Sequence, residues 1–272
     1  MNRTFRIACA TLLVLSLTPV IFAQEIKPFF NETMSFSITW KGVYVGRVTM
    51  KTAVGQNNQL KSVAKVIPTD KINGIYYVQG SFGAVWDYAK QKSVFAYEEA
   101  YQGDMYQKRS YRFNGNNVAV SKHEIRFTEF SYPHKGKVSE GKDNYNLSTD
   151  GYADLLGAFY TIRTLPKKPQ VGDVEKIKVL PAGSRKILIL QIIDKKTIDV
   201  PVLGKKEVLH VKTALADPDT NKIGSGGSLF FNTKSQIEMY ITNDGNYVPV
   251  KMWTTLPLMG TVYVNLASYS QP

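Results

Sequence analysis

Cysteine is almost absent from this sequence, since the single residue of this type, Cys9, lies near the N-terminus. The segment around it has a basic start at Arg3 and Arg6, an apolar stretch over 7–17 and a small residue, Ala23, at its end. This order is typical of a cleavable secretory signal peptide and predicts cleavage after Ala23. The mature chain then lacks cysteine, which excludes disulfides, thiol nucleophiles and thiolate metal sites and requires an apolar core to hold the fold.

Recognisable catalytic and ligand-binding motifs are also missing. The three histidines, His123, His134 and His210, form no closely spaced pair of the kind that binds zinc. No glycine-flanked serine opens a helix, and no glycine-rich loop ends in the lysine and hydroxyl residue that hold a phosphate. The sequence therefore predicts neither a metal nor a cofactor.

Acidic residues are outnumbered by basic ones. The signal peptide removes two of the 34 basic residues and none of the 22 acidic ones, which leaves the mature chain with a net charge of about +10. The lysines are spread along the chain in pairs such as Lys195-Lys196, whereas a nucleic-acid binder concentrates them on one element. This distribution and the predicted export argue against nucleic acid. Two interpretations stay open: general solubility, or attraction to an anionic lipid, lipopolysaccharide or polysaccharide with peripheral envelope association.

Apolar residues recur mainly with a period of two, as in Phe36, Ile38 and Trp40, which is typical of half-buried strands. Turn signals at 114–117 and 243–246 separate such stretches. The polar stretch 135–146 is expected to be an exposed loop or a ragged hairpin. The stretch 186–194 is apolar on both faces of a strand and is therefore expected to be a central strand. The pattern predicts strands over 35–40, 43–52, 60–67, 75–78, 85–88, 93–102, 108–113, 118–132, 175–180, 186–194, 196–202, 207–215, 236–242, 247–255 and 261–269.

One helix is predicted within the C-terminal half. Thr149 or Asp150 is expected to cap its start, and Arg163 suits the negative end of its dipole. Its apolar stripe consists of Leu155, Leu156, Phe159 and Ile162.

The expected fold is mainly β, a large curved antiparallel sheet or half-barrel with one packed α-helix. Residues 24–272 are expected to form a single β-rich envelope domain, with two lobes meeting near 135–165 as the alternative. A sheet of this size curls, and its concave inner face is a natural place for a binding site.

Aromatic residues give the main hint of a ligand, since their rings suit amphipathic molecules and sugar faces, although they also favour strands. Two carboxylates are candidates for acid or base chemistry on a glycan. Asp87 lies between two aromatic residues, although an aspartate near a strand end more commonly forms a turn. Glu98 is adjacent to Glu99, and in a strand the two side chains point to opposite faces. The candidate ligand-binding residues are Trp40, Trp86, Tyr88, Tyr97, Tyr101 and Arg109.

Three segments show a resemblance to a known family. They are WKGVYVG at 40–46, YADLLGAFYTIR at 152–163 and ITNDGNYVPV at 241–250, followed by Gly260, Leu266 and Tyr269. In order and spacing they resemble a bacterial envelope family known as domain of unknown function 3108. The resemblance implies an exported, β-rich protein of Gram-negative bacteria and carries no catalytic residues with it.

Asp154 and Arg163 lie in the segment where this resemblance is strongest. Nine positions apart on a helix, they are separated by about two and a half turns and cannot pair with each other. We expect each of them to attach the helix to the sheet through a charge-assisted hydrogen bond.

The leading functional hypothesis is a noncatalytic periplasmic binding or scaffolding protein for an amphipathic or anionic envelope component, such as a lipid, a lipopolysaccharide precursor or a glycan. One alternative is a hydrolase or lyase that acts on envelope polysaccharide through Asp87 or Glu98. Another is a structural partner in an envelope assembly complex.

The signal peptide gives a direct prediction. N-terminal sequencing of the exported protein is expected to begin at Gln24, because the small side chain of Ala23 meets the requirement of the processing site. An intact Met1 would contradict the prediction and would indicate an uncleaved N-terminal anchor.

Overall fold

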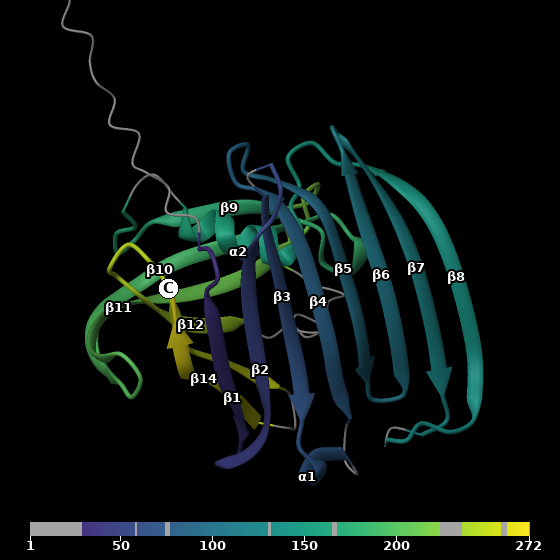
Figure 1. Ribbon diagram of the computed structural model, residues 1–272, viewed down its shortest axis with the longest axis horizontal. Coiled ribbons are helices and arrows are strands. Elements are labelled where there is room, and N and C mark those ends of the chain that lie inside the picture. Colours follow the sequence, from purple (N-terminus) through teal and green to yellow (C-terminus); the bar gives the residue numbers. More distant parts are fainter. Residues whose placement is uncertain are drawn as a thin grey trace, which may run out of the picture.

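A computed structural model describes residues 29–57, 59–73, 77–129, 132–164, 168–223, 236–256 and 260–271. The predicted signal peptide lies outside these residues. The described residues form one antiparallel sheet of 14 strands, which curves strongly around its inner face (Figure 1). The prediction of a large curved antiparallel sheet with a packed helix is therefore confirmed.

The sheet consists of two meanders joined along β1 and β14. Strands that follow one another in sequence are neighbours in space, except for β8 and β9, which form the two edges of the sheet. The first meander contains β1 (Thr33–Trp40), β2 (Val43–Val54), β3 (Gln59–Pro68), β4 (Val78–Asp87), β5 (Lys92–Gln102), β6 (Met105–Asn114), β7 (Asn117–Phe127) and β8 (Lys137–Ser148). The second contains β9 (Val174–Val179), β10 (Lys186–Val200), β11 (Gly204–Ala216), β12 (Ile237–Thr242), β13 (Pro249–Leu256) and β14 (Gly260–Ser270).

The helical elements are short compared with the strands. They are α1 (Asp70–Asn73), α2 (Leu155–Arg163) and a 3₁₀ turn, η1 (Pro181–Gly183). Figure 1 shows α2 inside the curve near one end of the sheet, with α1 and the β1–β2 turn at the opposite end. Because α2 lies in the chain between the two edge strands, it links the open sides of the sheet.

Two short strands predicted over 75–78 and 85–88 fall on one continuous strand, β4, which runs from Val78 to Asp87, and residues 75 and 76 of the first prediction lie outside the described part of the chain. Gly80 and Gly83 lie between the two predicted stretches, and both are within the ladder that β4 forms with β5. A Cβ at position 83 would overlap the ring of Tyr97. The glycine therefore makes room for a cross-strand tyrosine and does not end the strand.

The polar stretch at 135–146, predicted to be an exposed loop or a ragged hairpin, instead forms most of one long edge strand, β8. Most of its side chains are exposed on both faces, and the strand pairs only with β7. An edge strand with few buried side chains lacks the alternation that reveals a half-buried strand, which explains the wrong prediction.

The stretches 186–194 and 196–202, predicted as two strands, belong to one long strand, β10, which ends at Val200. It is the second strand from an edge, not a central one, and Ile193 on it is exposed. A bulge after Ile192 shifts the pairing with β11 and ends the inward-facing apolar series of Leu188, Leu190 and Ile192.

Asp154 caps α2, in place of the predicted Thr149 or Asp150. Its Oδ1 accepts a hydrogen bond from the Gly157 N–H at 2.9 Å, and its Oδ2 accepts one from the Ser93 hydroxyl on β5 at 2.6 Å. The backbone between Asp150 and Asp154 is not helical, because Ala153 forms a bridge with Val179 of β9. The helix therefore starts later, attached at its N-terminus to the first meander.

The other end of α2 is attached through a buried ion pair. Arg163 Nη1 and Nη2 each donate to a carboxylate oxygen of Glu32 at 2.6 Å, and both side chains are almost fully buried. Arg163 Nε donates to the Asn246 carbonyl at 2.8 Å, and the guanidinium lies 3.9 Å from the ring centre of Phe29. One side chain thus joins the helix to the segment before β1 and to the β12–β13 turn.

The apolar core is divided among clusters that α2 connects. Ala158 packs with a cluster from β9 to β12, which includes Leu190 and Val211. Tyr160, two residues further along the helix, packs with Leu60 and Trp86 of the first meander. The helix therefore holds the two meanders together from the inside.

Substitution of Arg163 by methionine is expected to destabilise the protein by about 3–5 kcal/mol, because it leaves the Glu32 carboxylate buried without a cation. Urea unfolding measures this loss, and adding Glu32→Leu should restore part of the stability. Arg185→Met is the matched control, since Arg185 pairs with Asp219 at an exposed site. Equal losses for Arg163→Met and Arg185→Met would contradict the importance of the buried pair.

Candidate apolar cavity

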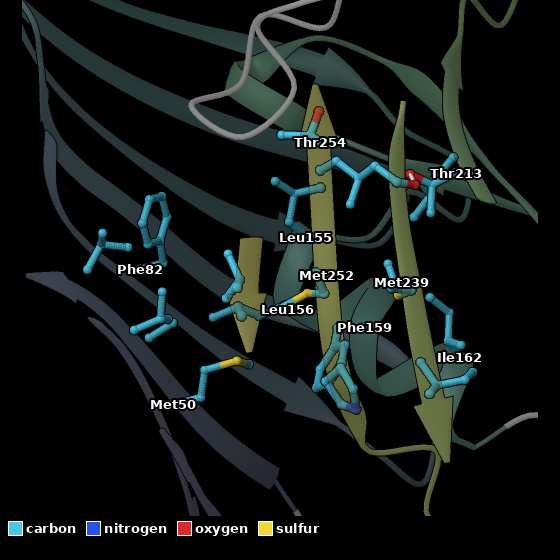
Figure 2. A pocket seen from close by; sticks show the side chains of 18 of the residues that line it. Met50, Phe82, Leu155, Leu156, Phe159, Ile162, Thr213, Met239, Met252 and Thr254 are labelled. Carbon is cyan, nitrogen blue, oxygen red and sulfur yellow. Dashed lines mark hydrogen bonds between the residues drawn. The ribbon is translucent and has the colours of Figure 1, made fainter. Parts of the chain in front are cut away.

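A cavity of about 630 Å³ lies between α2 and the inner face of the sheet. Its side chains point toward one another from the helix and from strands of both meanders, as Figure 2 shows. The predicted apolar stripe of α2, Leu155, Leu156, Phe159 and Ile162, forms one wall. This stripe faces an open space in addition to packing against the core.

The two remaining walls come from the two meanders. Met50 on β2 and Phe82 on β4 lie on one side, and Met239 on β12 and Met252 on β13 lie on the other (Figure 2). Methionine side chains are unbranched and polarizable, so they adapt to apolar ligands of different shapes. The walls can therefore adjust to a flexible chain.

Several polar groups on the cavity wall already have partners within the protein. Thr213 Oγ1 donates to the Ile237 carbonyl at 2.9 Å, and Thr254 Oγ1 donates to the Gln236 carbonyl at 3.2 Å. Asp154 and Arg163 also reach the wall, and both are engaged in the contacts that hold α2. These groups leave a surface that suits an apolar molecule.

Glu98 is the wall residue with the most unusual environment. Burial raises its pKa, and the charge of Arg109, whose Nη1 lies 3.7 Å from the carboxylate, offsets only part of that rise. Arg109 also donates to Gln107 and Glu124, each at 2.7 Å. The guanidinium is thus part of a network on β5, β6 and β7 that holds Glu98 in place.

A family model described as a protein of unknown function, DUF3108, matches residues 35–267. The chain belongs to the DUF3108 family. The match runs from β1 to β14 and includes α2, so it covers both meanders and every wall of the cavity. No curated protein matches the chain.

A solved structure has the same type of fold as this DUF3108 protein. A β-barrel-like protein of domain of unknown function DUF1849 from Brucella abortus is 9% identical, with a TM-score of 0.56, and covers 89% of this chain and 97% of its own. A candidate exported protein with a YmcC-like fold from Bacteroides fragilis is also 9% identical, with a TM-score of 0.34 and coverage of 89% and 96%. At 9% identity the similarity to the Brucella protein concerns the fold alone, and nothing is inferred from the second structure.

The two candidate carboxylates do not lie together in this DUF3108 fold. Asp87 pairs with Lys92 across the β4–β5 turn, and Glu98 is six positions further along β5, which places it roughly 20 Å away. Glycosidases hold their two carboxylates within about 10 Å. The structure therefore does not bring Asp87 and Glu98 together as an acid and base pair.

Asp87 has a clear local role in the turn after β4. Its carboxylate accepts a hydrogen bond from the Lys90 backbone N–H and forms an ion pair with the Lys90 ammonium, both at 3.1 Å. Burial acts to raise the pKa of Asp87, but the hydrogen bonds and charge of Lys90 outweigh it and lower the pKa. These contacts are those of an aspartate that forms a turn.

The candidate aromatic residues separate into two groups. Trp40 and Tyr97 line the cavity. Trp86 is buried in the core beside Tyr160, at a ring-centre distance of 6.5 Å.

Two further candidates lie away from the cavity wall. Tyr88 packs edge to face on Phe30 at a ring-centre distance of 5.7 Å. Tyr101 stacks on His134 at 5.3 Å and contacts Tyr106 at 4.9 Å between ring centres.

The cavity residues on β10 to β14, which include Met239, were not predicted, because residues that line a cavity and residues that fill a core follow the same alternation.

Possible metal ligands do not cluster in the part of the chain that the structure describes. There, no group of three or more histidine, cysteine, aspartate and glutamate residues lies close enough to hold a metal ion. Across the same residues, no helix is both long and apolar enough to cross a membrane.

The raised pKa of Glu98 predicts a pH effect on stability. The folded state binds more protons than the unfolded state above the ordinary pKa of 4.5, so the free energy of unfolding should fall as the pH rises through the raised pKa. Glu98→Gln should reduce this fall in urea unfolding measured across the window. Glu99→Gln, at an exposed neighbouring site, serves as the control, and identical pH profiles for wild type and Glu98→Gln would refute the effect.

Proposed function

We propose that this protein is a noncatalytic periplasmic carrier of an amphipathic envelope lipid, whose apolar chain occupies the cavity between α2 and the sheet. The observation that carries the proposal is the apolar cavity of about 630 Å³, which falls in the range of small-molecule sites. The periplasmic location follows from the predicted signal peptide.

The chemistry of the walls favours a lipid over a glycan. A glycan presents hydroxyl groups that need hydrogen-bond partners, while the wall offers mainly aliphatic, methionine and aromatic side chains. An alkyl chain gains about 0.8 kcal/mol for each buried methylene, so about ten methylenes would supply roughly 8 kcal/mol before the cost of association. A flexible chain also suits the adaptable surface of Met50, Met239 and Met252.

A purely structural role is the second candidate, and it predicts the opposite result in a binding experiment. A scaffold needs no empty interior, because protein interiors normally pack to a density that leaves few voids. The size of this cavity therefore favours the carrier.

Binding of a fluorescent long-chain fatty acid, cis-parinaric acid, tests the proposal with residues 24–272. Met252→Trp fills the cavity and should weaken binding at least about tenfold, equivalent to a loss of about 1.4 kcal/mol. Met105→Trp on β6 is the matched control, since Met105 does not line the cavity.

The wild type and Met105→Trp should bind alike, and native mass spectrometry of protein purified from the periplasm should detect co-purified lipid. Failure of the wild type to bind, together with a mass free of lipid, would support the scaffold. Equal binding by Met252→Trp would place the fatty acid outside the cavity.

A further inference from the structure

A group of apolar side chains is exposed at the end of the sheet opposite α2. Val43 is 47% exposed, Tyr44 44%, Ile67 38% and Tyr263 37%. They come from the start of β2, the end of β3 and the start of β14. Large apolar side chains exposed together commonly mark a surface that contacts a partner.

The position of this end follows from the length of β1. Its start lies beside Glu32, which binds Arg163 at the end of α2, and its last residue, Trp40, is roughly 25 Å further along the strand. Figure 1 shows the β1–β2 turn at the end of the sheet away from α2. Because Trp40 also lines the cavity, the exposed group lies next to the end of the cavity that α2 does not close.

Cross-strand pairing places three aromatic residues in one row. Thr39 pairs with Tyr44 of β2 on one side and with Tyr263 of β14 on the other, and Tyr263 in turn pairs with Trp253 of β13. Paired residues in an antiparallel sheet share a face. Tyr44, Tyr263 and Trp253, called here the aromatic row, therefore lie on one face across four adjacent strands.

Basic side chains accompany the aromatic row. The Lys251 ammonium lies 5.0 Å from the ring centre of Tyr263 and 5.9 Å from that of Trp253. The Lys41 ammonium lies 5.1 Å from the ring of Trp40, and Arg47 is exposed opposite Ile67.

Acidic groups are fewer at this end of the sheet. Glu238, which pairs with Trp253, accepts from His210 Nε2 at 2.7 Å. On α1, Asp70 is followed by Lys71. The surface around the aromatic row therefore carries an excess of positive charge.

We propose that the aromatic row and the β1–β2 turn dock on the surface of an anionic lipid bilayer. Tyrosine and tryptophan rings favour the membrane–water interface, because one part of each ring system is apolar and another part forms hydrogen bonds. Each lysine or arginine near an anionic surface contributes about 1 kcal/mol. The apolar tip at Val43 and Tyr44 enters the boundary between head groups and acyl chains.

Docking in this orientation turns the cavity end beside Trp40 toward the membrane. If the carrier function proposed above holds, a lipid chain can pass from the bilayer to the cavity without crossing water. The docking itself rests on the aromatic, aliphatic and basic side chains at this end of the sheet, of which Trp253 is partly buried and also reaches the cavity.

Vesicle flotation tests the docking with residues 24–272. Vesicles that contain phosphatidylglycerol should carry the protein to the top of the gradient, and vesicles of phosphatidylcholine alone should carry much less of it. The double variant V43D/Y44S should reduce partitioning at least about tenfold, since it removes apolar area and adds a negative charge. Lys41→Glu should weaken binding to the anionic vesicles in particular.

Val138→Asp on the edge strand β8 is the matched control, since Val138 is 63% exposed and far along the sheet from β1. It should float like the wild type. Equal flotation with both vesicle types, or unchanged flotation of V43D/Y44S, would overturn the docking. Failure of the wild type to bind either type of vesicle would also overturn the docking. A protein partner would then be the occupant of this surface.

The docking and the carrier function can be tested independently of each other. V43D/Y44S should bind cis-parinaric acid normally in the absence of vesicles, and Met252→Trp should still float with anionic vesicles. Flotation of the wild type without fatty acid binding would support the docking and refute the carrier.

Discussion

The buried ion pair of Arg163 with Glu32 is the contact on which the arrangement of the sheet depends. Among the described residues no hydrogen-bond ladder joins β8 to β9, so the two edge strands of the 14-stranded sheet could move apart or together by many routes. Arg163 fixes one end of α2 to the segment before β1 and to the β12–β13 turn, while Asp154 fixes the other end to β5. The helix thereby sets the distance between the two meanders from within.

The cavity is a consequence of this arrangement. A helix with one apolar stripe cannot fill the whole concave side of so large a sheet, and the space left beside Leu155 and Phe159 is bounded by side chains from both meanders. Empty apolar space forgoes the dispersion contacts that a packed interior makes. A bound alkyl chain would restore those contacts, so the same geometry that weakens the unoccupied core would favour an apolar ligand.

The sequence predicted those elements whose periodicity reflects burial on one side. The strands predicted over 35–40 and 43–52 and the helix with its apolar stripe are examples, because a spacing of two residues and a spacing of three to four residues each leave a local signal. Strand β8 was missed because its side chains are exposed on both faces, and Asp154 was missed as the helix cap because the bridge of Ala153 with β9 is a tertiary contact. Met239 and Met252 could not be recognised as cavity residues, since inward-facing residues look alike in a sequence whether or not space lies beside them.

The pairing of β1 with β14 has a consequence for how the chain reaches its fold. The first strand of the sheet finds one of its two neighbours only in β14, the last strand of the sheet, so a partner for one side of β1 is missing until nearly the whole chain has been synthesised. Contacts between residues so far apart in sequence slow folding, because a long loop must close before they form. During this interval the edge of β1 and the apolar interior are open to other chains, which makes the time before β14 pairs the stage at which the molecule is most exposed to aggregation.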